Sequence, residues 1–327
     1  MIIDLARLGD VTLASPVIAN LRINHPDARI DFLVSRNSAS TVLHNPKLNN
    51  VYVVDTPSGG LINQVREVRK IAEMLRSDSY DVAFILHRSF GSVIMAKLAG
   101  IPVRVGLNTE VRGFLLTHKT RLDRTRHRMD NNLALLELMD EKVSTRKPEY
   151  FPLEEISGVV KQAEEFKGNS SLVVINPNGV WETKRWRTEK FRILVEKLLS
   201  NYGVRIIVIG GKGDEQRGEI VSQGNPDVLN LTSKTTVDDL YRICRISKLV
   251  ITNDSGPMHI AACADVPIIA IFGPTDPRRC GPRNGQNQIV NADVGCLKCY
   301  KKTCADLKCM DKLDVDQVLI KAGMFLN

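Results

Sequence analysis

Five short segments of this sequence place polar or charged side chains directly after an apolar run. They are RLGD (7–10), HRSFGS (87–92), NPNGVWETKRW (176–186), GGKGDE (210–215) and NDSGPMH (253–259). An apolar run followed by a polar, glycine-containing loop is typical of a buried strand that leads into a helix. The start of such a helix presents unpaired N–H groups, which attract anions such as phosphates. We therefore expect these segments to form a site for an anionic ligand.

The last of these segments shows the pattern most clearly. The β-branched run SKLVI precedes it, and VPIIAIF follows it. Gly256 frees the backbone, Pro257 suits the first position of a helix, and Ile260 begins a small apolar helix face. The sequence therefore predicts that Asp254, Ser255 and Gly256 form a loop between a strand and a helix.

Asp10 follows Gly9 at the start of the first expected helix, and two roles fit it. A carboxylate at this place can cap free N–H groups and complement the helix dipole. It can instead act as a general base, provided that it reaches a substrate hydroxyl rather than its own helix. Residue type and position alone favour the cap.

Lys184 lies beside Arg185, Trp186 and Arg187 in a loop that follows a strand. Such a cluster is often a solvated basic face on a packed aromatic ring. A flexible ammonium at a strand end could equally neutralise a diphosphate leaving group, as transfer from a nucleotide-sugar requires. Charge and position leave both interpretations open.

Three further residues are ambiguous on residue type alone. Glu215 ends a glycine-rich turn, like the acid that binds ribose hydroxyls in dinucleotide folds, although its spacing differs from that fingerprint. His259 lies one turn into the helix predicted after Gly256, and His87 ends an earlier strand. Each histidine is either a site residue or a core residue with backbone partners.

Several enzyme classes lack their motifs here. The sequence contains no H-E-x-x-H, P-loop or G-x-S-x-G segment, so protease, P-loop NTPase and α/β-hydrolase functions lose their main support. The D-x-D segment is DVD at 314–316, in the C-terminal tail, where it is poorly placed to clamp a metal ion and a diphosphate.

Four of the seven cysteines cluster in CLKCYKKTCADLKC, as Cys296, Cys299, Cys304 and Cys309. Their C-x2-C-x4-C-x4-C spacing allows a structural zinc or iron–sulfur site, but zinc sites usually separate two close pairs by a longer loop. Packed thiols or a disulfide are the alternative. The other three cysteines, Cys244, Cys263 and Cys280, are expected to be structural.

The elements that would position these loops alternate between strand and helix in both halves of the chain. Strands are expected in the first half at 2–6, 29–35, 50–55, 80–86 and 102–107. They are expected in the second half at 171–177, 204–211, 228–232, 248–252 and 266–272, with helices at 188–202 and after Thr236. Each half is therefore predicted to be an α/β domain with a doubly wound sheet.

The join between the halves is expected around 145–168, where prolines interrupt the pattern. We divide the chain into domains 1–152 and 153–327, with the final helix expected to pack back on the first domain. Because the strand-end loops of a doubly wound sheet share one edge, both domains should present these loops to a cleft between them.

The composition limits the possible partners. A net charge of +8 on 327 residues favours an anionic partner. Nucleic acid is set aside, because aromatic residues make up only 5% of the chain and no nucleic-acid motif accompanies the basic residues. No run of about 18 or more apolar residues occurs, and the N-terminus lacks a signal-peptide pattern. We expect a soluble, cytoplasmic protein.

Together these segments resemble the family 9 glycosyltransferases, the ADP-heptose:lipopolysaccharide heptosyltransferases of Gram-negative bacteria. The resemblance covers nearly the whole chain, through RLGDVTLASPVIANLR, YDVAFILHRS, LAGIPVRVG, HRMDNNLALLE, KRW, NDSGPMHIAA and FGPTDP. It implies two Rossmann-like domains in the GT-B arrangement and an inverting transfer that uses neither metal nor cofactor. The implied donor is ADP-heptose, held mostly by the second domain.

The resemblance also assigns roles to residues. Asp10 resembles the general base, Lys184 the cation on the donor diphosphate, and Glu215 the ribose-binding acid. Gly179 and Val180 depart from the polar pair that precedes the lysine in some relatives. The implied donor-binding loop comprises Asp254, Ser255, Gly256, Met258 and His259.

The implied acceptor is an inner-core sugar linked to lipid A. Its phosphates and carboxylates would draw a basic protein to the inner face of the inner membrane as a peripheral partner. The expected acceptor-binding residues are His87, Arg88, Arg112 and Arg121. The neighbouring basic residues are either part of the same surface or a solvated charge run, namely Lys119, Arg124, Arg126 and Arg128.

Two other functions fit the same two-domain plan. One is a sugar-nucleotide epimerase, and the other is a non-catalytic nucleotide-sugar-binding protein. A requirement for an acceptor separates the transferase from the epimerase. No motif fixes which heptose transfer is made, or that the sugar is heptose.

Overall fold

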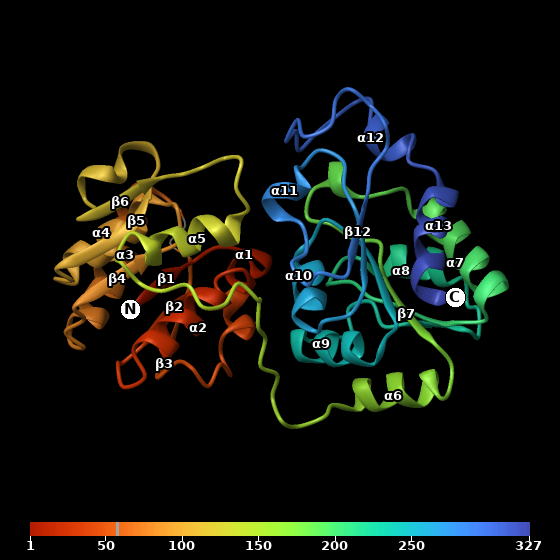
Figure 1. Ribbon diagram of the computed structural model, residues 1–327, viewed down its shortest axis with the longest axis horizontal. Helices are drawn as coiled ribbons and strands as arrows, with labels where there is room; N and C mark the ends of the chain where they lie inside the picture. Colours follow the sequence, from red (N-terminus) through yellow and green to blue (C-terminus); the bar gives the residue numbers. More distant parts are fainter. Residues whose placement is uncertain (57–58) are drawn as a thin grey trace. The chain divides into compact units, whose positions relative to one another are not determined.

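The computed structural model describes residues 1–56 and 59–327. The chain forms two compact units, Met1–Phe151 and Pro152–Asn327 (Figure 1). Within the described residues each unit contains a six-stranded parallel sheet with helices on both faces, so the prediction of two Rossmann-like α/β domains is confirmed. No helix in the same ranges is both long and apolar enough to cross a membrane.

The first sheet has the strand order β3-β2-β1-β4-β5-β6. Its strands are β1 (Ile2–Asp4), β2 (Asp31–Ser35), β3 (Asn50–Val54), β4 (Val82–Ile85), β5 (Val103–Asn108) and β6 (His118–Arg121). All pairs are parallel, and Ile3 of β1 lies opposite Leu33 on one side and Ile85 on the other. The order reverses between β1 and β4, which is where a doubly wound sheet opens a crevice at its carboxyl edge.

Two apolar layers cover the first sheet. One contains α1 (Leu8–Thr12), α2 (Ser15–Asn24) and α5 (Arg128–Glu137), and the other contains α3 (Leu61–Arg76) and α4 (Phe90–Leu98). Side chains alternate along each strand, so Ile2 and Phe84 pack in the first layer while Ile3 and Ile85 pack in the second. Two 3-10 turns, η1 (Arg36–Thr41) and η2 (Glu110–Phe114), follow β2 and β5.

The second sheet repeats this plan with the order β12-β11-β10-β7-β8-β9. Its strands are β7 (Leu172–Asn176), β8 (Arg205–Val208), β9 (Val228–Asn230), β10 (Leu249–Asn253), β11 (Ile268–Ile271) and β12 (Asn287–Val290). Here the order reverses between β7 and β10, so the loops after these two strands flank the crevice of the second unit.

The helices of the second unit also form two layers. They are α6 (Gly158–Lys167), α7 (Thr188–Tyr202), α8 (Glu215–Ser222), α9 (Val237–Ile246), α10 (Gly256–Cys263), α11 (Pro277–Cys280), α12 (Lys308–Asp311) and α13 (Val315–Leu326), with a 3-10 turn η3 (Glu182–Lys184). The final helix was expected on the first domain, but Val318 and Ala322 of α13 join Leu194 and Leu198 of α7 in the second core. The apolar side of α13 is thus buried within its own unit (Figure 1).

All seven cysteines lie among the described residues, and none of them is in a disulfide. Cys244, Cys263 and Cys309 are buried and Cys280 is partly buried, whereas Cys296, Cys299 and Cys304 are exposed between β12 and α12. Among the described residues, no three His, Cys, Asp or Glu side chains are grouped so that they could hold a metal ion. The four clustered thiols are therefore not joined by a disulfide in this structure.

Candidate active site

Asp10, His87 and Arg88 lie together at the strand reversal of the first unit. Asp10 is in α1, which follows β1, and the other two residues follow β4. All three line a cavity of about 460 Å³ at the carboxyl edge of the sheet. Its other polar lining residues are Arg7, Ser35, Asn37, Ser38, Thr56 and Arg128. The structure thus brings three of the predicted residues to one site.

Asp10 is paired with an arginine at this site. The N-cap residue of α1 is Arg7, so Asp10 lies within the first turn of its helix and is not the cap. Its Oδ1 lies 3.2 Å from Nε of Arg128, and its side chain is 38% exposed. The carboxylate is therefore held by Arg128 and remains accessible from the cavity.

A second carboxylate lies behind this pair. Asp4, the last residue of β1, is fully buried, and its Oδ2 lies 4.0 Å from Nη2 of Arg128. The backbone N–H of Ala6 donates a hydrogen bond to its Oδ1 at 3.1 Å. Burial raises the pKa of Asp4 to about 6, and the charge of Arg128 opposes that shift. Arg128 therefore lies between one buried and one accessible acid, an arrangement that the sequence analysis did not predict.

His87 is neutral at physiological pH. Burial lowers its pKa to about 4, and the charges of Arg128 and Arg112 add to this effect. Its Nδ1 shares hydrogen bonds with Oγ of Ser92 at 2.9 Å and with Oγ of Ser89 at 3.2 Å. The imidazole can therefore orient a hydroxyl group of a ligand, but it supplies no charge for a phosphate.

Arg112 was expected to bind the acceptor, and the structure contradicts this. Its side chain is fully buried. The guanidinium donates to the carbonyls of Leu107 at 2.8 and 3.0 Å, of His87 at 2.5 Å and of Ser89 at 3.4 Å. Arg112 thus ties the loop after β4 to β5 and has no exposed surface with which to contact an acceptor.

Arg121 lines a neighbouring cavity in the same unit. This cavity, of about 450 Å³, is lined by Arg88, Arg121 and Arg124 together with Asn108, Thr109 and Leu122. Arg88 lines both this cavity and the one that contains Asp10. Since three cations line it, the second cavity suits an anionic group.

Lys184 and Asp254 form an ion pair at the strand reversal of the second unit. Nζ of Lys184 lies 2.7 Å from Oδ2 of Asp254, and Oγ1 of Thr275 donates to the same oxygen at 2.6 Å. The ammonium also lies 4.6 Å from the centre of the Trp181 ring. An ammonium has three N–H donors, so this lysine is fixed in place with capacity left for an anionic ligand.

The loop that carries Lys184 is anchored from behind by the C-terminal segment. Nε1 of the buried Trp186 donates to the carbonyl of Leu313 at 3.1 Å. Nζ of Lys190 donates to the carbonyls of Asp311 at 2.6 Å and of Leu313 at 2.7 Å. Arg187 pairs with the Asp311 carboxylate. The position of the lysine therefore depends on residues far along the chain.

The start of α10 lies beside this ion pair. Ser255 is the N-cap residue of α10, but its side chain does not cap the helix. Its Oγ instead accepts a hydrogen bond from Nδ2 of Asn176 at 2.8 Å. Gly256 is the first helical residue. The helix start thus presents backbone N–H groups next to the ammonium of Lys184, as an anion site requires.

Met258 and His259 lie deeper than the sequence suggested. The Met258 side chain is fully buried in the second unit, so the surface that this residue offers at the helix start is its backbone. His259 is also buried, with 6% of its surface exposed.

Glu215 begins α8, after β8, and it is exposed. Ser233 donates a hydrogen bond to its Oε1, and this bond is the main reason why the pKa of Glu215 is lowered. Because β8 pairs with β7, the loop that contains Glu215 is next to the loop that contains Lys184. An ionised acid at this place can accept hydrogen bonds from the hydroxyl groups of a ribose.

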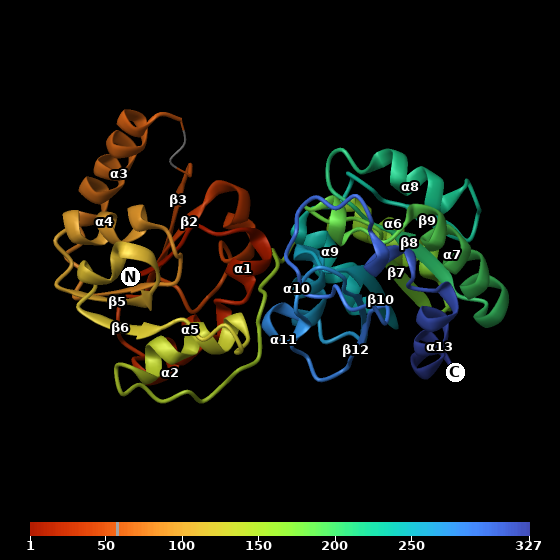
Figure 2. The same ribbon diagram turned by 90° about the horizontal axis from the view of Figure 1, so that it is seen from above.

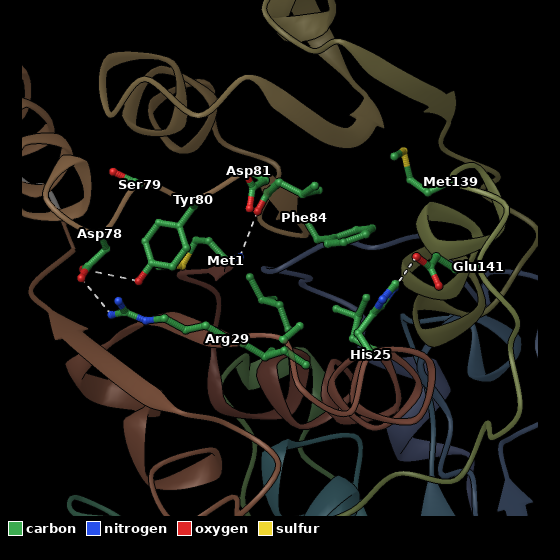
Figure 3. A pocket seen from close by; sticks show the side chains of 15 residues that line it. Met1, His25, Arg29, Asp78, Ser79, Tyr80, Asp81, Phe84, Met139 and Glu141 are labelled. Atoms are coloured by element: carbon green, nitrogen blue, oxygen red, sulfur yellow. Dashed lines mark hydrogen bonds and ion pairs between the residues drawn. The ribbon is translucent and has the colours of Figure 1, made fainter.

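The first unit has another cavity, at the opposite edge of its sheet (Figure 3). It measures about 410 Å³ and lies at the amino ends of β1 and β4. Its polar side chains are paired with each other, since Arg29 lies 2.9 Å from Asp78 and His25 lies 2.6 Å from Glu141. None of the residues predicted for the site lines it. The carboxyl edge, which carries Asp10, His87 and Arg88, is therefore the better candidate for chemistry.

The chain is similar to known heptosyltransferases along most of its length. It is 26% identical over 321 residues to lipopolysaccharide heptosyltransferase 2 of Escherichia coli K12, a match that covers 94% of this chain and 91% of that protein. The glycosyl transferase family 9 structure from Veillonella parvula matches with a TM-score of 0.84 at 26% identity, covering 99% of this chain and 96% of that one. The structure of E. coli ADP-heptose lps heptosyltransferase II has the same fold, with a TM-score of 0.80 at 22% identity over 99% of this chain and 97% of that chain.

The family model described as glycosyltransferase family 9 (heptosyltransferase) matches residues 68–310. That range includes His87 and Arg88 of the first unit and Lys184, Glu215 and Asp254 of the second. Because the match spans most of the chain, the chain belongs to glycosyltransferase family 9.

Proposed function

We propose that this protein is an inverting heptosyltransferase of lipopolysaccharide core synthesis. It moves heptose from ADP-heptose to an inner-core sugar linked to lipid A, and it uses neither metal nor cofactor. The observation that carries this proposal is the Lys184 ammonium, fixed by Asp254 beside the uncapped start of α10. That arrangement suits the diphosphate of a departing nucleotide.

The second unit binds the donor in this proposal. Lys184 and the first N–H groups of α10 contact the diphosphate, and Glu215 accepts hydrogen bonds from the ribose. ADP-heptose is favoured because a relative of the same fold carries that donor in its name. Lys184 and the start of α10 supply the positive charge that the leaving group needs. This supports a mechanism that requires no metal ion.

The first unit binds the acceptor. The reactive hydroxyl lies in the cavity beside Asp10, where neutral His87 helps to orient it. Arg88 and Arg121 contact the anionic groups of the acceptor, since both line the cavity with three arginines. Arg128 holds one oxygen of Asp10 and leaves the other to accept a proton.

The chemical step follows from these roles. Asp10 takes the proton of the acceptor hydroxyl while that oxygen attacks the anomeric carbon of heptose. The bond from the anomeric carbon to the β-phosphate oxygen breaks, and its electron pair leaves with ADP, whose charge Lys184 stabilises. A single displacement of this kind inverts the anomeric configuration. The reaction takes place in the cytoplasm, at the inner face of the inner membrane where the lipid-linked acceptor lies.

The proposal is tested by offering the purified protein a panel of nucleotide-sugars with and without a core acceptor. We expect release of ADP from ADP-heptose that depends on the acceptor. Interconversion of sugar epimers without an acceptor would support an epimerase instead. Binding of a nucleotide-sugar without turnover would support a non-catalytic nucleotide-sugar-binding protein.

Asp10→Asn is expected to reduce turnover about a hundredfold or more, because an amide keeps the size of the side chain but cannot take the proton. The melting temperature and ADP binding should hardly change. Asp27→Asn, in an exposed turn, is the matched control and should keep full activity. Near-normal turnover of Asp10→Asn would remove this residue from the mechanism.

A further inference from the structure

The apolar side of α3 is only partly covered by its own unit. Its buried residues are Val68, Ile71, Ala72 and Leu75. Leu61 and Val65 lie on the same side, because they precede Val68 by seven and three residues. Yet Leu61 is 77% exposed, Val65 is 43% exposed, and the adjacent Ile62 is 84% exposed. The first turns of α3 therefore carry an apolar side beyond the packed core, and Figure 2 shows them extending past α4.

Cations border these exposed apolar residues. Arg66, Arg69 and Lys70 are exposed on the same turns. Together with Leu61, Ile62, Val65 and Glu73 they line a shallow groove of about 650 Å³. This half of α3 is thus an amphipathic segment with a basic border.

Apolar side chains are also exposed on α4, which packs against α3, and on η2. A Cβ at Gly91, in the first turn of α4, would lie 3.7 Å from the side chain of Val68. The neighbouring Phe90 ring lies 6.3 Å from the Phe114 ring of η2. Phe114 and Val111 are each 73% exposed. Apolar side chains are therefore exposed on α3, α4 and η2 of the first unit.

We propose that this α3 surface, made of the first turns of α3, the start of α4 and η2, docks the first unit on an anionic lipid bilayer. Side chains such as Leu61, Ile62 and Phe114 enter the boundary between headgroups and acyl chains, and Arg66, Arg69 and Lys70 pair with lipid phosphates. The charges of the border complement an anionic surface, and a bilayer requires no matching shape. The proposal rests on the proposed function, because the lipid-linked acceptor of that reaction lies in such a membrane.

The test is sedimentation of the full-length protein with vesicles, without donor or acceptor. Vesicles of phosphatidylglycerol and phosphatidylcholine are compared with vesicles of phosphatidylcholine alone, and we expect binding only to the anionic ones. The double variant Arg69→Glu with Lys70→Glu should bind at least roughly 25-fold more weakly, since each charge near the surface contributes about fivefold. Leu61→Ser with Ile62→Ser should bind about tenfold more weakly or worse.

Matched controls come from the second unit. Lys161→Glu with Arg245→Glu changes two exposed cations, and Ile320→Ser changes an apolar residue that is 71% exposed. Both should bind vesicles like the wild type, and all variants should keep the wild-type melting temperature. Wild-type protein that stays in the supernatant, or α3 variants that bind as well as the wild type, would overturn the proposal.

Sedimentation velocity of the same proteins distinguishes a lipid surface from a second copy of the chain. A dimer that the Leu61→Ser, Ile62→Ser variant abolishes, without vesicle binding by the wild type, would overturn the proposal in favour of self-association. Because these measurements use no sugar donor, vesicle binding that persists while heptose transfer fails would contradict the proposed function and not the docking surface.

Discussion

At the scale of single residues, Arg128 connects two acids with different surroundings. Asp10 is accessible from the cavity, whereas Asp4 is enclosed at the end of β1. An arginine stays protonated throughout the physiological range, so its charge is always available to both. Above its pKa of about 6, Asp4 is ionised and attracts Arg128. Asp4 therefore acts as a positioning group that holds Arg128, and through it Asp10, toward the cavity.

Asp4 gives a prediction about stability and pH. Its pKa is raised from 3.8 to about 6 in the folded protein, so folding favours its protonated form. The stability gained in this way is fully present below about pH 4 and is lost as the pH rises through 6. The loss is roughly 3 kcal/mol in the free energy of unfolding. Asp4→Asn does not titrate, so the variant should become more stable relative to the wild type over this range.

The measurement is urea unfolding of both proteins between pH 4 and 7. Other groups titrate equally in the two proteins. The difference between the unfolding free energies of wild type and Asp4→Asn therefore reports the titration of Asp4 alone. Asp27→Asn, at an exposed position, should show no such trend. A constant difference between wild type and Asp4→Asn across these pH values would show that the buried acid does not titrate there.

The sequence predicted those site residues that stand in glycine-containing loops after strands. Asp10, Lys184, Glu215 and Asp254 were proposed in this way. The structure places Asp10, Lys184 and Asp254 at the two strand reversals and Glu215 in the neighbouring loop after β8. Asp4 was missed because it lies inside an apolar strand run, where nothing marks an acid as a partner of a distant arginine. The burial of Arg112 was missed because the type of a side chain does not show which carbonyl groups surround it.

At the scale of elements, the loop after β8 packs tightly against the loop after β7. A Cβ at Gly210 would come within 2.4 Å of Nδ2 of Asn178 and 2.9 Å of the Thr232 side chain. Asn178 is buried, and its amide donates to the carbonyl of Ile209 at 3.1 Å. The absence of a side chain at Gly210 therefore allows the loops that carry Lys184 and Glu215 to approach each other.

Gly210→Ala should lower the stability of the second unit by about 1–3 kcal/mol, because the methyl group overpacks this contact. It should also weaken ADP binding, since the two donor loops move apart. Gly211→Ala is a close control, because its Cβ would meet only the Asp214 carboxylate, at 3.9 Å. Thermal unfolding and calorimetric titration with ADP check both variants. Equal behaviour of the two would mean that the close contact at Gly210 is dispensable.

Every strand predicted from the sequence is present, because buried parallel strands are marked by continuous apolar runs. The two strands that were not predicted are β6, with the sequence HKTR, and β12, with the sequence NQIV. Both are edge strands. They are partly exposed and need fewer apolar residues, so periodicity does not distinguish them from loops. The first expected helix, at whose start Asp10 was placed, is instead two helices, α1 and α2.

At the scale of the whole molecule, the residues proposed for the acceptor all lie in Met1–Phe151 and those proposed for the donor all lie in Pro152–Asn327. Each unit also has its own core clusters. A ligand that binds one folded unit stabilises that unit by mass action. The two units can therefore be distinguished by their responses to ADP.

Calorimetry is expected to resolve two unfolding transitions, of which ADP shifts only one. At about 100 times its dissociation constant, ADP should add roughly 2.7 kcal/mol to the unit that binds it. The shift should be the same in EDTA as in magnesium, because Lys184 and α10 supply the positive charge. Asp10→Asn should keep the shift, whereas Lys184→Met should lose most of it. A shift that disappears in EDTA would contradict a donor site that works without metal.

The anchoring of the Lys184 loop by Leu313 sets the order in which the two units can mature during translation. The first unit is complete once Phe151 has been added. The loop of the second unit gains its hydrogen bonds from Trp186 and Lys190 only when Leu313 is present. At usual rates of synthesis this is roughly 10–30 seconds later. A nascent chain could therefore settle on the membrane through α3 well before it is able to hold a nucleotide-sugar.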